Sequence, residues 1–514
     1  MQFPTRFEWA AAAITAILLI LSFPNFELSF LAWIALVPLM VVIVRRPAPA
    51  AAFLLGWAAG TVFFYGSSYW LTYSMIHYGG LRTVVAYLLL FPAALVVGVF
   101  PGLFAFFLAL AIKKWCRTAV LFAPVFWPAT EWARLIITGQ LWNALGYSQA
   151  YHPTFIQPAV WGGVYAVSFV IVLLNTAIVL LITARSSHGV SISGFVVLMV
   201  PATIAFSPFF ETYKQPTLTR PVTVVALQPN VPMNLDKTDE EMKQLLERHW
   251  SMSTNALKSL PVDNSTRLVI WPESPMNFTY AGEKTFRDQL ANFTKTNHAS
   301  LLFNSLEPTT AGGFYNSALL INEDGRLIAQ YDKIRLMPFG EYVPLPQWLP
   351  GASLITGLVG DFTPGDRYTL MPFGEHRAGT FICIESAYPF IARRLTNEGA
   401  DLLINISNDG YLGPTAVMRQ HLANVIFRAV ENGRPVLRVT NTGISAQIDA
   451  RGVIDDQTKS FEPEVRVWQL QPYLIRNTFY TRHGDLFVYV CTTITILVFF
   501  AILFSSRRSL RQQR

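Results

Sequence analysis

The stretch GTFICIESAYPFIARRLTNEGADLLINIS (379–407) decides the fold of the polar half of this chain. It begins and ends with short, almost entirely apolar runs, at 379–384 and 401–407, and a helical pattern lies between them at about 388–398. Apolar runs of this length suit strands that are buried on both faces of a sheet. Strands alternating with helices predict an α/β domain whose helices pack on the faces of the sheet.

The same alternation extends along the chain on both sides of this stretch. Four further runs have the same β-type character: VTVVALQ (222–228), RLVIW (267–271), SLLFN (300–304) and RPVLRVT (434–440). Helical patterns lie at about 238–260, 283–297 and 415–432. The last helical pattern places Met418, Leu422, Val425 and Ala429 on one face, and Gly433 is suited to end it.

The composition of the whole chain does not fit a soluble α/β protein. Its 514 residues are 52% hydrophobic and only 14% charged, whereas soluble chains carry about 25% charged residues. This composition excludes disordered, fibrous and nucleic-acid-coating proteins. Only 12 charged residues fall within 1–210, and the other 59 lie in the remaining 304 positions. The first part is therefore expected to lie in a membrane and the second to be mostly exposed to water.

Membrane-spanning helices need about 20 mostly apolar residues. Eight spans are expected, near 9–24, 27–44, 50–72, 83–112, 118–135, 158–183, 190–210 and 486–504. With a cytoplasmic N-terminus, eleven Lys and Arg residues fall on the cytoplasmic side, and only Arg82 and Arg134 fall in the opposite short loops. This bias predicts that both termini are cytoplasmic and that the polar domain lies outside the cytoplasm.

The expected organisation therefore has three parts. A membrane domain with seven helices covers 1–210, an extracytoplasmic catalytic domain covers 211–483, and an eighth helix with a basic cytoplasmic tail covers 484–514. The fifth span carries Glu131 and Arg134, which share a helix face. Charged pairs inside membranes often have a function. A mutually satisfied structural pair at the membrane edge is the alternative.

Candidate chemistry centres on Cys383. The three cysteines, Cys116, Cys383 and Cys491, cannot form a disulfide framework, and only Cys383 lies in the polar half. It ends a predicted strand and enters a turn before Pro389, a position that exposes a side chain on a fixed backbone. A lone cysteine is otherwise most often a small buried hydrophobe. Phosphate-binding loops, hydrolase elbows and histidine-rich metal spacings are absent from the sequence, and His421 is interpreted as structural.

Two more polar residues, Glu273 and Lys333, follow predicted strands and can converge with this thiol. Glu273 comes after 267–271, Lys333 follows another strand, and Glu341 lies eight residues further on in a loop. A thiol needs a base or a positive neighbour to become a thiolate. Glu273 can take the proton, and Lys333 can stabilise the thiolate and a later oxyanion. The backbone N–H of Ile384 is a second candidate oxyanion donor, and an amine or water would resolve the thioester.

Three blocks carry a family resemblance: WPES (271–274), YDKIRLMPFGEYVP (331–344) and FICIES (381–386) resemble those of the nitrilase superfamily. With seven spans before the domain and one after it, the chain resembles the apolipoprotein N-acyltransferase family. LGYSQ (145–149), SNDGYLGP (407–414), the segment 420–445 and YTRHGD (480–485) agree with this resemblance. It implies a multi-span membrane protein with an inserted αββα nitrilase-like domain, on the periplasmic side of a bacterial inner membrane.

The resemblance also implies a reaction and roles for residues. A fatty acyl group passes from a phospholipid, typically phosphatidylethanolamine, to Cys383, and then to the α-amine of the S-diacylglyceryl-cysteine of an apolipoprotein. No metal, cofactor or nucleic acid is implied. Glu273 corresponds to the general base, Lys333 stabilises the intermediate, and Glu341 positions the lysine. Glu385 corresponds to another functionally important glutamate. Candidate substrate-binding residues are Tyr411, Asn408 and Trp348.

The chain departs from the family pattern in three places. Ile384 and Leu235 replace residues that are often aromatic, and the aromatic residue expected after Asn408–Asp409 is shifted to Tyr411. The apolar loop 344–365 follows the lysine block and is expected to act as a lid that dips into the bilayer surface. A loop packed on its own domain is the alternative.

Two other functions remain open at this point. A membrane-tethered amidase would use the same three residues with water as the acceptor, but a water-soluble amide substrate needs no eight-helix platform. A transporter with an extracytoplasmic binding domain would belong to a different class. The first seven spans show one charged pair and no evident inverted repeat, which argues against a transporter.

Overall fold

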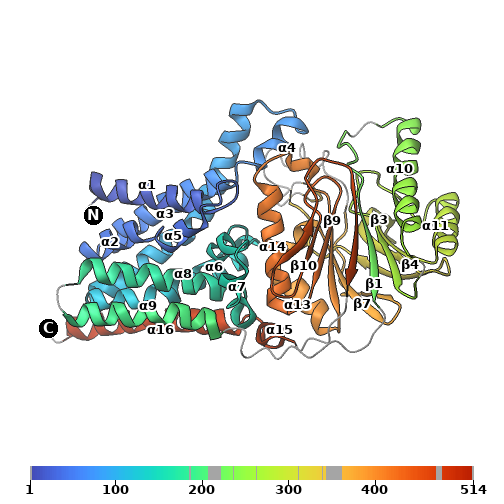
Figure 1. Ribbon diagram of the computed structural model, residues 1–514. Coiled ribbons are helices and arrows are strands. Elements are labelled where there is room, and N and C mark those ends of the chain that lie inside the picture. The colour runs from blue at the N-terminus through green and yellow to red at the C-terminus, as the bar shows by residue number, and fades with distance from the viewer. Residues whose placement is uncertain are drawn as a thin grey trace. The chain divides into compact units, whose positions relative to one another are not determined.

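The structure is a computed structural model that describes residues 3–184, 187–206, 221–234, 237–261, 263–310, 312–338, 340–342, 362–470 and 477–511. The chain forms two compact units, which we call the helical unit and the sheet unit (Figure 1). The helical unit comprises Met1–Glu211, Thr415–Glu431 and Thr478–Arg514, and the sheet unit comprises Thr212–Pro414 and Asn432–Asn477.

The sheet unit contains two six-stranded mixed sheets. The first, in the order β12–β1–β2–β3–β4–β5, consists of β1 (Val222–Gln228), β2 (Thr266–Ile270), β3 (Ser300–Pro308), β4 (Phe314–Ile321), β5 (Leu327–Asp332) and β12 (Glu464–Leu470). The second, in the order β11–β10–β9–β8–β7–β6, consists of β6 (Leu370–Phe373), β7 (His376–Ile382), β8 (Leu402–Ser407), β9 (Val436–Thr440), β10 (Ala446–Ile448) and β11 (Ile454–Gln457). The central strands β1–β3 and β7–β9 run parallel, and antiparallel strands flank them.

Alternation along the central strands explains the layers of the sheet unit. In β1, Val222 and Val224 point into a core between the two sheets, whereas Val225 and Leu227 join a core beneath helices. Both faces are therefore apolar, because successive side chains of a strand point in opposite directions. The predicted buried runs are confirmed as strands, and with them the αββα sandwich.

Helices cover the outer faces of the sheets in the sheet unit. The helices α10 (Asp239–Lys258) and α11 (Lys284–Asn297) lie against the first sheet (Figure 1), and Leu245 and Leu290 belong to the core that they share with it. A shorter helix, α13 (Pro389–Asn397), contacts β7 and β8. It begins at Pro389, as predicted, because proline is tolerated in the first turn of a helix.

The helical unit is built mainly from long apolar helices. Its α-helices are α1 (Arg6–Ser22), α2 (Val37–Arg45), α3 (Pro49–Ser67), α4 (Leu71–His77), α5 (Thr83–Trp115), α6 (Ala123–Thr138), α7 (Pro153–Ile156), α8 (Ala159–Thr183), α9 (Ser187–Phe206), α14 (Val417–Asn432), α15 (Phe479–His483) and α16 (Leu486–Arg511). Among the residues that the structure describes, five segments are long and apolar enough to cross a membrane: Pro49–Ser67, Thr83–Trp115, Arg117–Thr138, Ala159–Thr183 and Leu486–Phe504.

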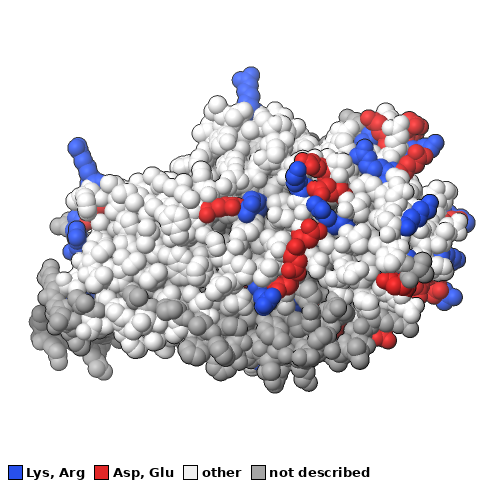
Figure 2. All heavy atoms as spheres, viewed as in Figure 1, with Lys and Arg blue, Asp and Glu red and all other residues white. Residues whose placement is uncertain are grey.

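These five segments coincide with five of the eight expected spans. The other three expected spans are also helical, but α1 has 17 residues and the expected span 27–44 is divided between a 3₁₀ turn and the short helix α2. The third is α9. The total of eight spans therefore stays a prediction. Figure 2 shows few charged side chains over the long helices and many more over the sheet unit, as the uneven charge distribution of the sequence predicts.

The helical unit also contains α14, although the chain joins this helix at both ends to strands of the sheet unit. The amphipathic pattern predicted one buried face, but residues 416–418 and 420–434 are all buried. Gln420 shows how a polar side chain of this helix can be buried. Its Oε1 accepts hydrogen bonds from the indoles of Trp70 and Trp142 at 3.0 and 2.8 Å, and its Nε2 donates to Pro24 O and Ser67 O.

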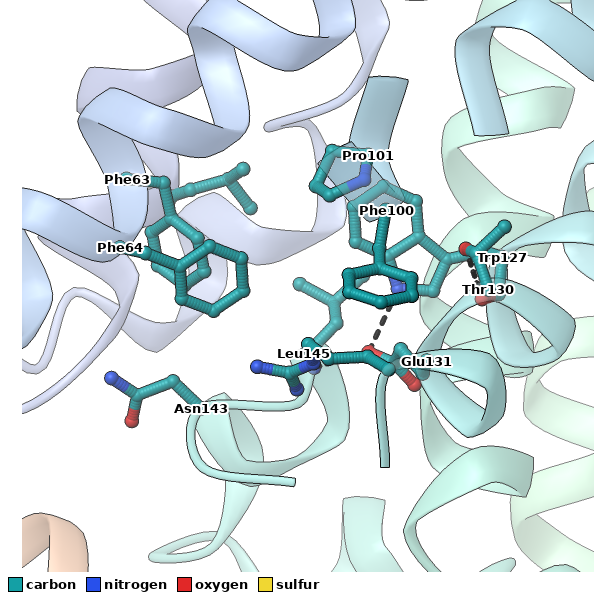
Figure 3. A pocket seen from close by; sticks show the side chains of 11 residues that line it. Phe63, Phe64, Phe100, Pro101, Trp127, Thr130, Glu131, Asn143 and Leu145 are labelled. Atoms are coloured by element: carbon teal, nitrogen blue, oxygen red, sulfur yellow. Dashed lines mark hydrogen bonds between the residues drawn. The ribbon is translucent and has the colours of Figure 1, made fainter. Parts of the chain in front are cut away.

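Glu131 and Arg134 are both buried in the helical unit, beside a cavity of about 20 Å³ that Phe64 and Asn143 also line (Figure 3). Glu131 Oε1 accepts hydrogen bonds from Trp127 Nε1 at 2.9 Å and from the Leu145 N–H at 2.7 Å. Arg134 donates to Trp142 O at 2.7 Å and lies over the Phe64 ring. Each charge is thus held by other groups, rather than by a direct ion pair with its neighbour.

Candidate active site

Cys383 follows the last residue of β7 and is the first residue of a 3₁₀ turn, Cys383–Ala387. Its φ angle is +52°, a left-handed conformation that is uncommon for residues other than glycine. Backbone strain of this kind is characteristic of functional sites, where the surrounding structure holds it. Cys383 is partly buried beside the core between the two sheets. The structure therefore places the predicted nucleophile at the end of a strand, on a constrained turn.

Lys333 is buried between two carboxylates. Its Nζ donates to Glu341 Oε1 at 2.9 Å and lies 3.4 Å from Glu273 Oε1, and its side chain is 1% exposed. The Lys333 backbone is fixed as well, because its N–H donates to Asn316 O and its carbonyl accepts from Gly365 N–H. Lys333 therefore contacts both glutamates that the sequence places near it, while the triad with Cys383 stays a prediction.

Asn316, on β4, joins this cluster and was missed from the sequence. Its Nδ2 donates both to Glu273 Oε1 at 2.9 Å and to Glu341 Oε1 at 2.7 Å, and its Oδ1 accepts from Asn304 Nδ2 at 2.7 Å. One amide group therefore bridges the two carboxylates that surround Lys333. No sequence signal marks Asn316, because it lies inside a strand rather than in a motif.

The second oxygen of Glu273 has a separate partner. Glu273 Oε2 accepts a hydrogen bond from the backbone N–H of Asn408 at 3.0 Å. The Asn408 side chain contacts Met233 Sδ and accepts from the Gly410 N–H and from Asn441 Nδ2. Asn408 therefore holds the carboxylate through its backbone, while its predicted role in binding substrate stays a prediction.

Glu385 ties the lysine segment to the cysteine turn. Its two oxygens accept hydrogen bonds from the backbone N–H groups of Ile334, Arg335 and Ile382 at 2.7, 3.0 and 2.7 Å, and both lie within 3.0 Å of the Tyr331 hydroxyl. Burial raises the pKa of Glu385 to about 7, although the backbone N–H groups act in the opposite direction. The geometry makes this glutamate a positioning residue for both neighbours.

A second buried network supports the cysteine turn from β8 and β9. Arg438 pairs with Asp409 at 2.6 Å and also donates to Asn405 Oδ1, and all three residues are buried. Asn405 Nδ2 in turn donates to Phe381 O and to Cys383 O at 3.2 and 3.5 Å. This hydrogen bond to Cys383 O thus comes from a neighbouring strand, which sequence spacing alone does not show.

The electrostatics favour a protonated thiol beside a permanent cation. Burial, followed by the charge of Glu273, raises the pKa of Cys383 above that of an ordinary thiol, and Lys333 opposes this effect. Burial alone would lower the pKa of Lys333, but Glu273 and Glu341 together raise it well above its ordinary value. The lysine is therefore a fixed positive charge rather than a base, and the thiol needs a neighbouring base to react.

The other predicted site residues stand as follows. Ile384 lies in the turn directly after Cys383, and Tyr411, 40% exposed, lies in the 3₁₀ turn Gly410–Leu412. Trp348, Leu235 and most of the proposed lid 344–365 lie outside the described residues. Among the described residues, no group of three or more His, Cys, Asp or Glu side chains could hold a metal ion.

Comparisons with known proteins agree with both units. The family described as "Apolipoprotein N-acyltransferase N-terminal domain" matches residues 15–177, and the carbon-nitrogen hydrolase family matches residues 222–480. The apolipoprotein N-acyltransferase of Geobacter metallireducens is 31% identical to this chain over 520 residues, covering 99% of this chain and 97% of that relative. The chain belongs to the apolipoprotein N-acyltransferase family.

Other relatives share the same family name. The apolipoprotein N-acyltransferase of Rhizobium meliloti is 28% identical over 437 residues, covering 80% of this chain and 78% of that relative. Among solved structures, a carbon-nitrogen hydrolase from Helicobacter pylori aligns with 49% of this chain and 89% of its own, with 18% identity and a TM-score of 0.38. As a member of the apolipoprotein N-acyltransferase family, the chain is a multi-span membrane protein with a nitrilase-like domain.

Proposed function

We propose that this protein transfers a fatty acyl group from a phospholipid to the N-terminal α-amine of S-diacylglyceryl-cysteine in apolipoproteins. The reaction proceeds through a thioester on Cys383. The observation that carries the proposal is the position of Lys333, a buried cation held by two carboxylates beside a strained thiol. Such a cation stabilises an oxyanion with little reorganisation, because the folded protein already holds it in position.

In the first half-reaction, Glu273 takes the proton of the Cys383 thiol. The thiolate attacks the carbonyl carbon of an acyl ester of the phospholipid, and the resulting oxyanion is stabilised by Lys333 Nζ and the Ile384 N–H. The intermediate collapses by breaking the bond between the carbonyl carbon and the glycerol oxygen, which takes the proton back from Glu273. Lysophospholipid leaves, and the acyl group remains on sulfur.

In the second half-reaction, the α-amine of the diacylated cysteine attacks the thioester carbonyl. Glu273 takes a proton from the attacking nitrogen, Lys333 again stabilises the oxyanion, and the carbon–sulfur bond breaks. The departing thiolate receives the proton from Glu273, which restores the thiol and leaves an amide product. Glu341 and Asn316 keep Lys333 and Glu273 in place through both steps.

The location of the reaction follows from the same proposal. Both substrates are lipids anchored in a bilayer, so a catalytic domain carried by membrane helices suits them. The proposed placement is the bacterial inner membrane, with residues 211–483 on the periplasmic side and both termini in the cytoplasm. The bias of Lys and Arg toward one side supports this orientation.

The test is the mass of the full-length protein in detergent after incubation with phosphatidylethanolamine alone. One acyl group should accumulate on Cys383, because no acceptor is present to remove it. Adding a diacylated lipopeptide should then release the group as an N-acyl product, whereas water alone should release it slowly. Cys383→Ala should block both steps. Transfer by a protein whose Cys383 is never acylated would contradict the thioester mechanism.

A further inference from the structure

Beyond the catalytic lysine, the sheet unit carries a group of arginines that the mechanism above does not use. Arg335 follows Lys333 by two residues and is exposed. Its guanidinium carbon lies 5.7 Å from the ring centre of Tyr388 and 5.3 Å from that of Phe390. The two rings support the guanidinium and restrict it, so its N–H edge is oriented before any ligand arrives.

Two arginines of α13 and one tyrosine complete the group. Arg394 lies over the Tyr368 ring, with its guanidinium carbon 5.8 Å from the ring centre. Arg335 lies over Phe390, which belongs to the same helix as Arg393 and Arg394, so the three arginines are close to one another. Burial and the charge of Glu385 raise the pKa of the Tyr368 hydroxyl, and the charges of the three arginines oppose this effect. We call Arg335, Arg393, Arg394 and Tyr368 the arginine cluster.

The arginine cluster has an excess of positive charge. Arg394 is paired with the exposed Glu398 at 3.0 Å. In the part of the chain that the structure describes, neither Arg335 nor Arg393 has a carboxylate partner within 4.0 Å. Within the same residues, the buried Nε of Arg393 also lacks a hydrogen-bond partner. Guanidinium groups without carboxylates, next to a hydroxyl donor, are suited to bind a phosphate, whose oxygens match the planar N–H fork.

The arginine cluster also adjoins the reacting groups. The backbone N–H of Arg335 donates to Glu385, which holds the cysteine turn, and Tyr388, whose ring Arg335 covers, follows that turn directly. A ligand phosphate bound there would therefore lie a short distance from the ester that Cys383 attacks. In a phospholipid, the phosphate and the acyl esters are attached to the same glycerol.

From this arrangement we propose that the arginine cluster binds the phosphodiester of the acyl-donor phospholipid. The inference rests on the proposed function and deepens it, because it separates the two half-reactions. The donor carries a phosphate, whereas the diacylglyceryl group of the acceptor carries none. The arginine cluster therefore acts in the acylation of Cys383 and has no part in the transfer to the amine.

The test measures acylation of Cys383 in the full-length protein with two donors, phosphatidylethanolamine in mixed micelles and the phosphate-free ester p-nitrophenyl palmitate. Arg335→Gln should lower kcat/KM for phosphatidylethanolamine about tenfold or more, as expected for a lost charge-assisted hydrogen bond. The rate with the phosphate-free ester should stay within about twofold. Arg335→Lys keeps the positive charge but loses the planar N–H fork of the guanidinium. Its kcat/KM for phosphatidylethanolamine should therefore lie between those of wild type and Arg335→Gln.

Three further measurements complete the test. Arg451→Gln removes an exposed arginine that pairs with Asp449 elsewhere in the sheet unit, and should leave both rates unchanged. Acyl-enzyme prepared with the phosphate-free ester should transfer to lipopeptide equally fast in wild type and Arg335→Gln. Added salt should slow wild-type acylation from phosphatidylethanolamine more than acylation from the neutral ester.

Each contrary result has a distinct meaning. Equal rates for wild type and Arg335→Gln with phosphatidylethanolamine would overturn the lipid assignment, and equal losses with both donors would show general damage to the site and overturn it too. Inhibition of wild type by millimolar inorganic phosphate, with no effect of Arg335→Gln on the lipid donor, would identify a free-anion site instead. If wild type is not acylated by phosphatidylethanolamine at all, the proposed function fails, and this inference with it.

Discussion

Both units bury charged side chains, but they arrange them differently. In the helical unit, Arg428 and Glu431 on α14 form an ion pair at 2.8 Å, and both are fully buried. Glu431 also accepts from the Val164 N–H, where α8 departs from helical geometry at Gly162 and Gly163. In the sheet unit, the buried charges share one centre instead, since Lys333 has two carboxylate neighbours and a thiol.

The difference indicates two uses of buried charge. A pair whose members contact each other and a nearby backbone N–H holds two segments together. A cation shared by two carboxylates is oriented by both, and it has three N–H donors. We therefore expect the buried pair of the helical unit to contribute to stability, and the shared cation of the sheet unit to serve the proposed chemistry.

The largest expected effect comes from removing the shared cation. Lys333→Met should slow acylation of Cys383 by about 100- to 1,000-fold, the range found when an oxyanion donor is lost. It leaves the partly buried Glu273 and the buried Glu341 close together without a cation, so the protein should also be less stable. The measurement is single-turnover acylation followed by mass spectrometry. Lys459→Met, at a lysine whose side chain is 78% exposed, is the matched control. A Lys333→Met protein that is acylated at the wild-type rate would refute the role of the cation.

The corresponding change in the helical unit should affect stability instead of chemistry. Arg428→Met leaves Glu431 buried and unpaired, which typically costs about 3–5 kcal/mol. Thermal unfolding in detergent should show a large drop in Tm, while acylation per folded molecule stays near that of wild type. Arg419→Met, on the same helix, removes a partly exposed pair with Glu27 and should change Tm little. Comparable losses of stability in both variants would mean that burial of the pair is not what matters.

Asn316 provides a sharper comparison, because it acts within the catalytic cluster without carrying charge. Asn316→Leu removes one amide that donates to Glu273 and Glu341, and should slow acylation about 10- to 100-fold. Asn316→Asp has nearly the same shape but adds a third carboxylate, so it should be slower still. Single-turnover acylation rates show which of the two variants is slower, and circular dichroism shows whether each variant is folded. A faster Asp variant would show that packing, and not hydrogen bonding, is the role of Asn316.

The sequence predicts the strands and residues that form this cluster better than it predicts how their side chains are arranged. Apolar runs located the central strands, and strand-end positions pointed to Glu273, Lys333 and Cys383. Their strands are not neighbours, because β2 and β5 are separated in the first sheet and β7 belongs to the second, an arrangement that the sequence does not show. Asn316 could not be found this way, since it lies within β4 and an asparagine inside a strand has no motif. The helix α14 was predicted, but its burial beyond one face was missed, because Gln420 is polar and only its four hydrogen bonds in the folded chain make its burial favourable.

A smaller effect is expected on the pKa of the Cys383 thiol, and its direction differs between two variants. Glu273 raises the pKa of Cys383 and Lys333 lowers it. Glu273→Gln should therefore shift the pH midpoint for alkylation of Cys383 to lower pH, and Lys333→Met should shift it to higher pH. The rate of modification by iodoacetamide, followed at Cys383 by peptide mass spectrometry, measures both, with the exposed Cys116 as an internal reference for the reagent. Shifts in the same direction for the two variants would contradict the assigned charges.

The smallest expected effect is a dependence on pH near neutrality. Burial raises the pKa values of Glu385 in the sheet unit and Glu431 in the helical unit to about 7, from an ordinary value of 4.5. Between about pH 4.5 and 7 the folded state therefore holds more protons than the unfolded state, so both groups make the fold less stable as pH rises through this window.

Activity should change in the opposite direction, and only through Glu385. When it is ionised, both of its oxygens are free to accept from the N–H groups of Ile334, Arg335 and Ile382, and protonation occupies one of them. Acylation per folded molecule should therefore be about fourfold slower at pH 6.5 than at pH 8, as expected for one ionisation near pH 7. Glu431→Gln should keep this activity profile while it removes part of the pH dependence of Tm. If Glu431→Gln instead abolished the pH dependence of acylation, the buried charges of the two units would not have separate uses.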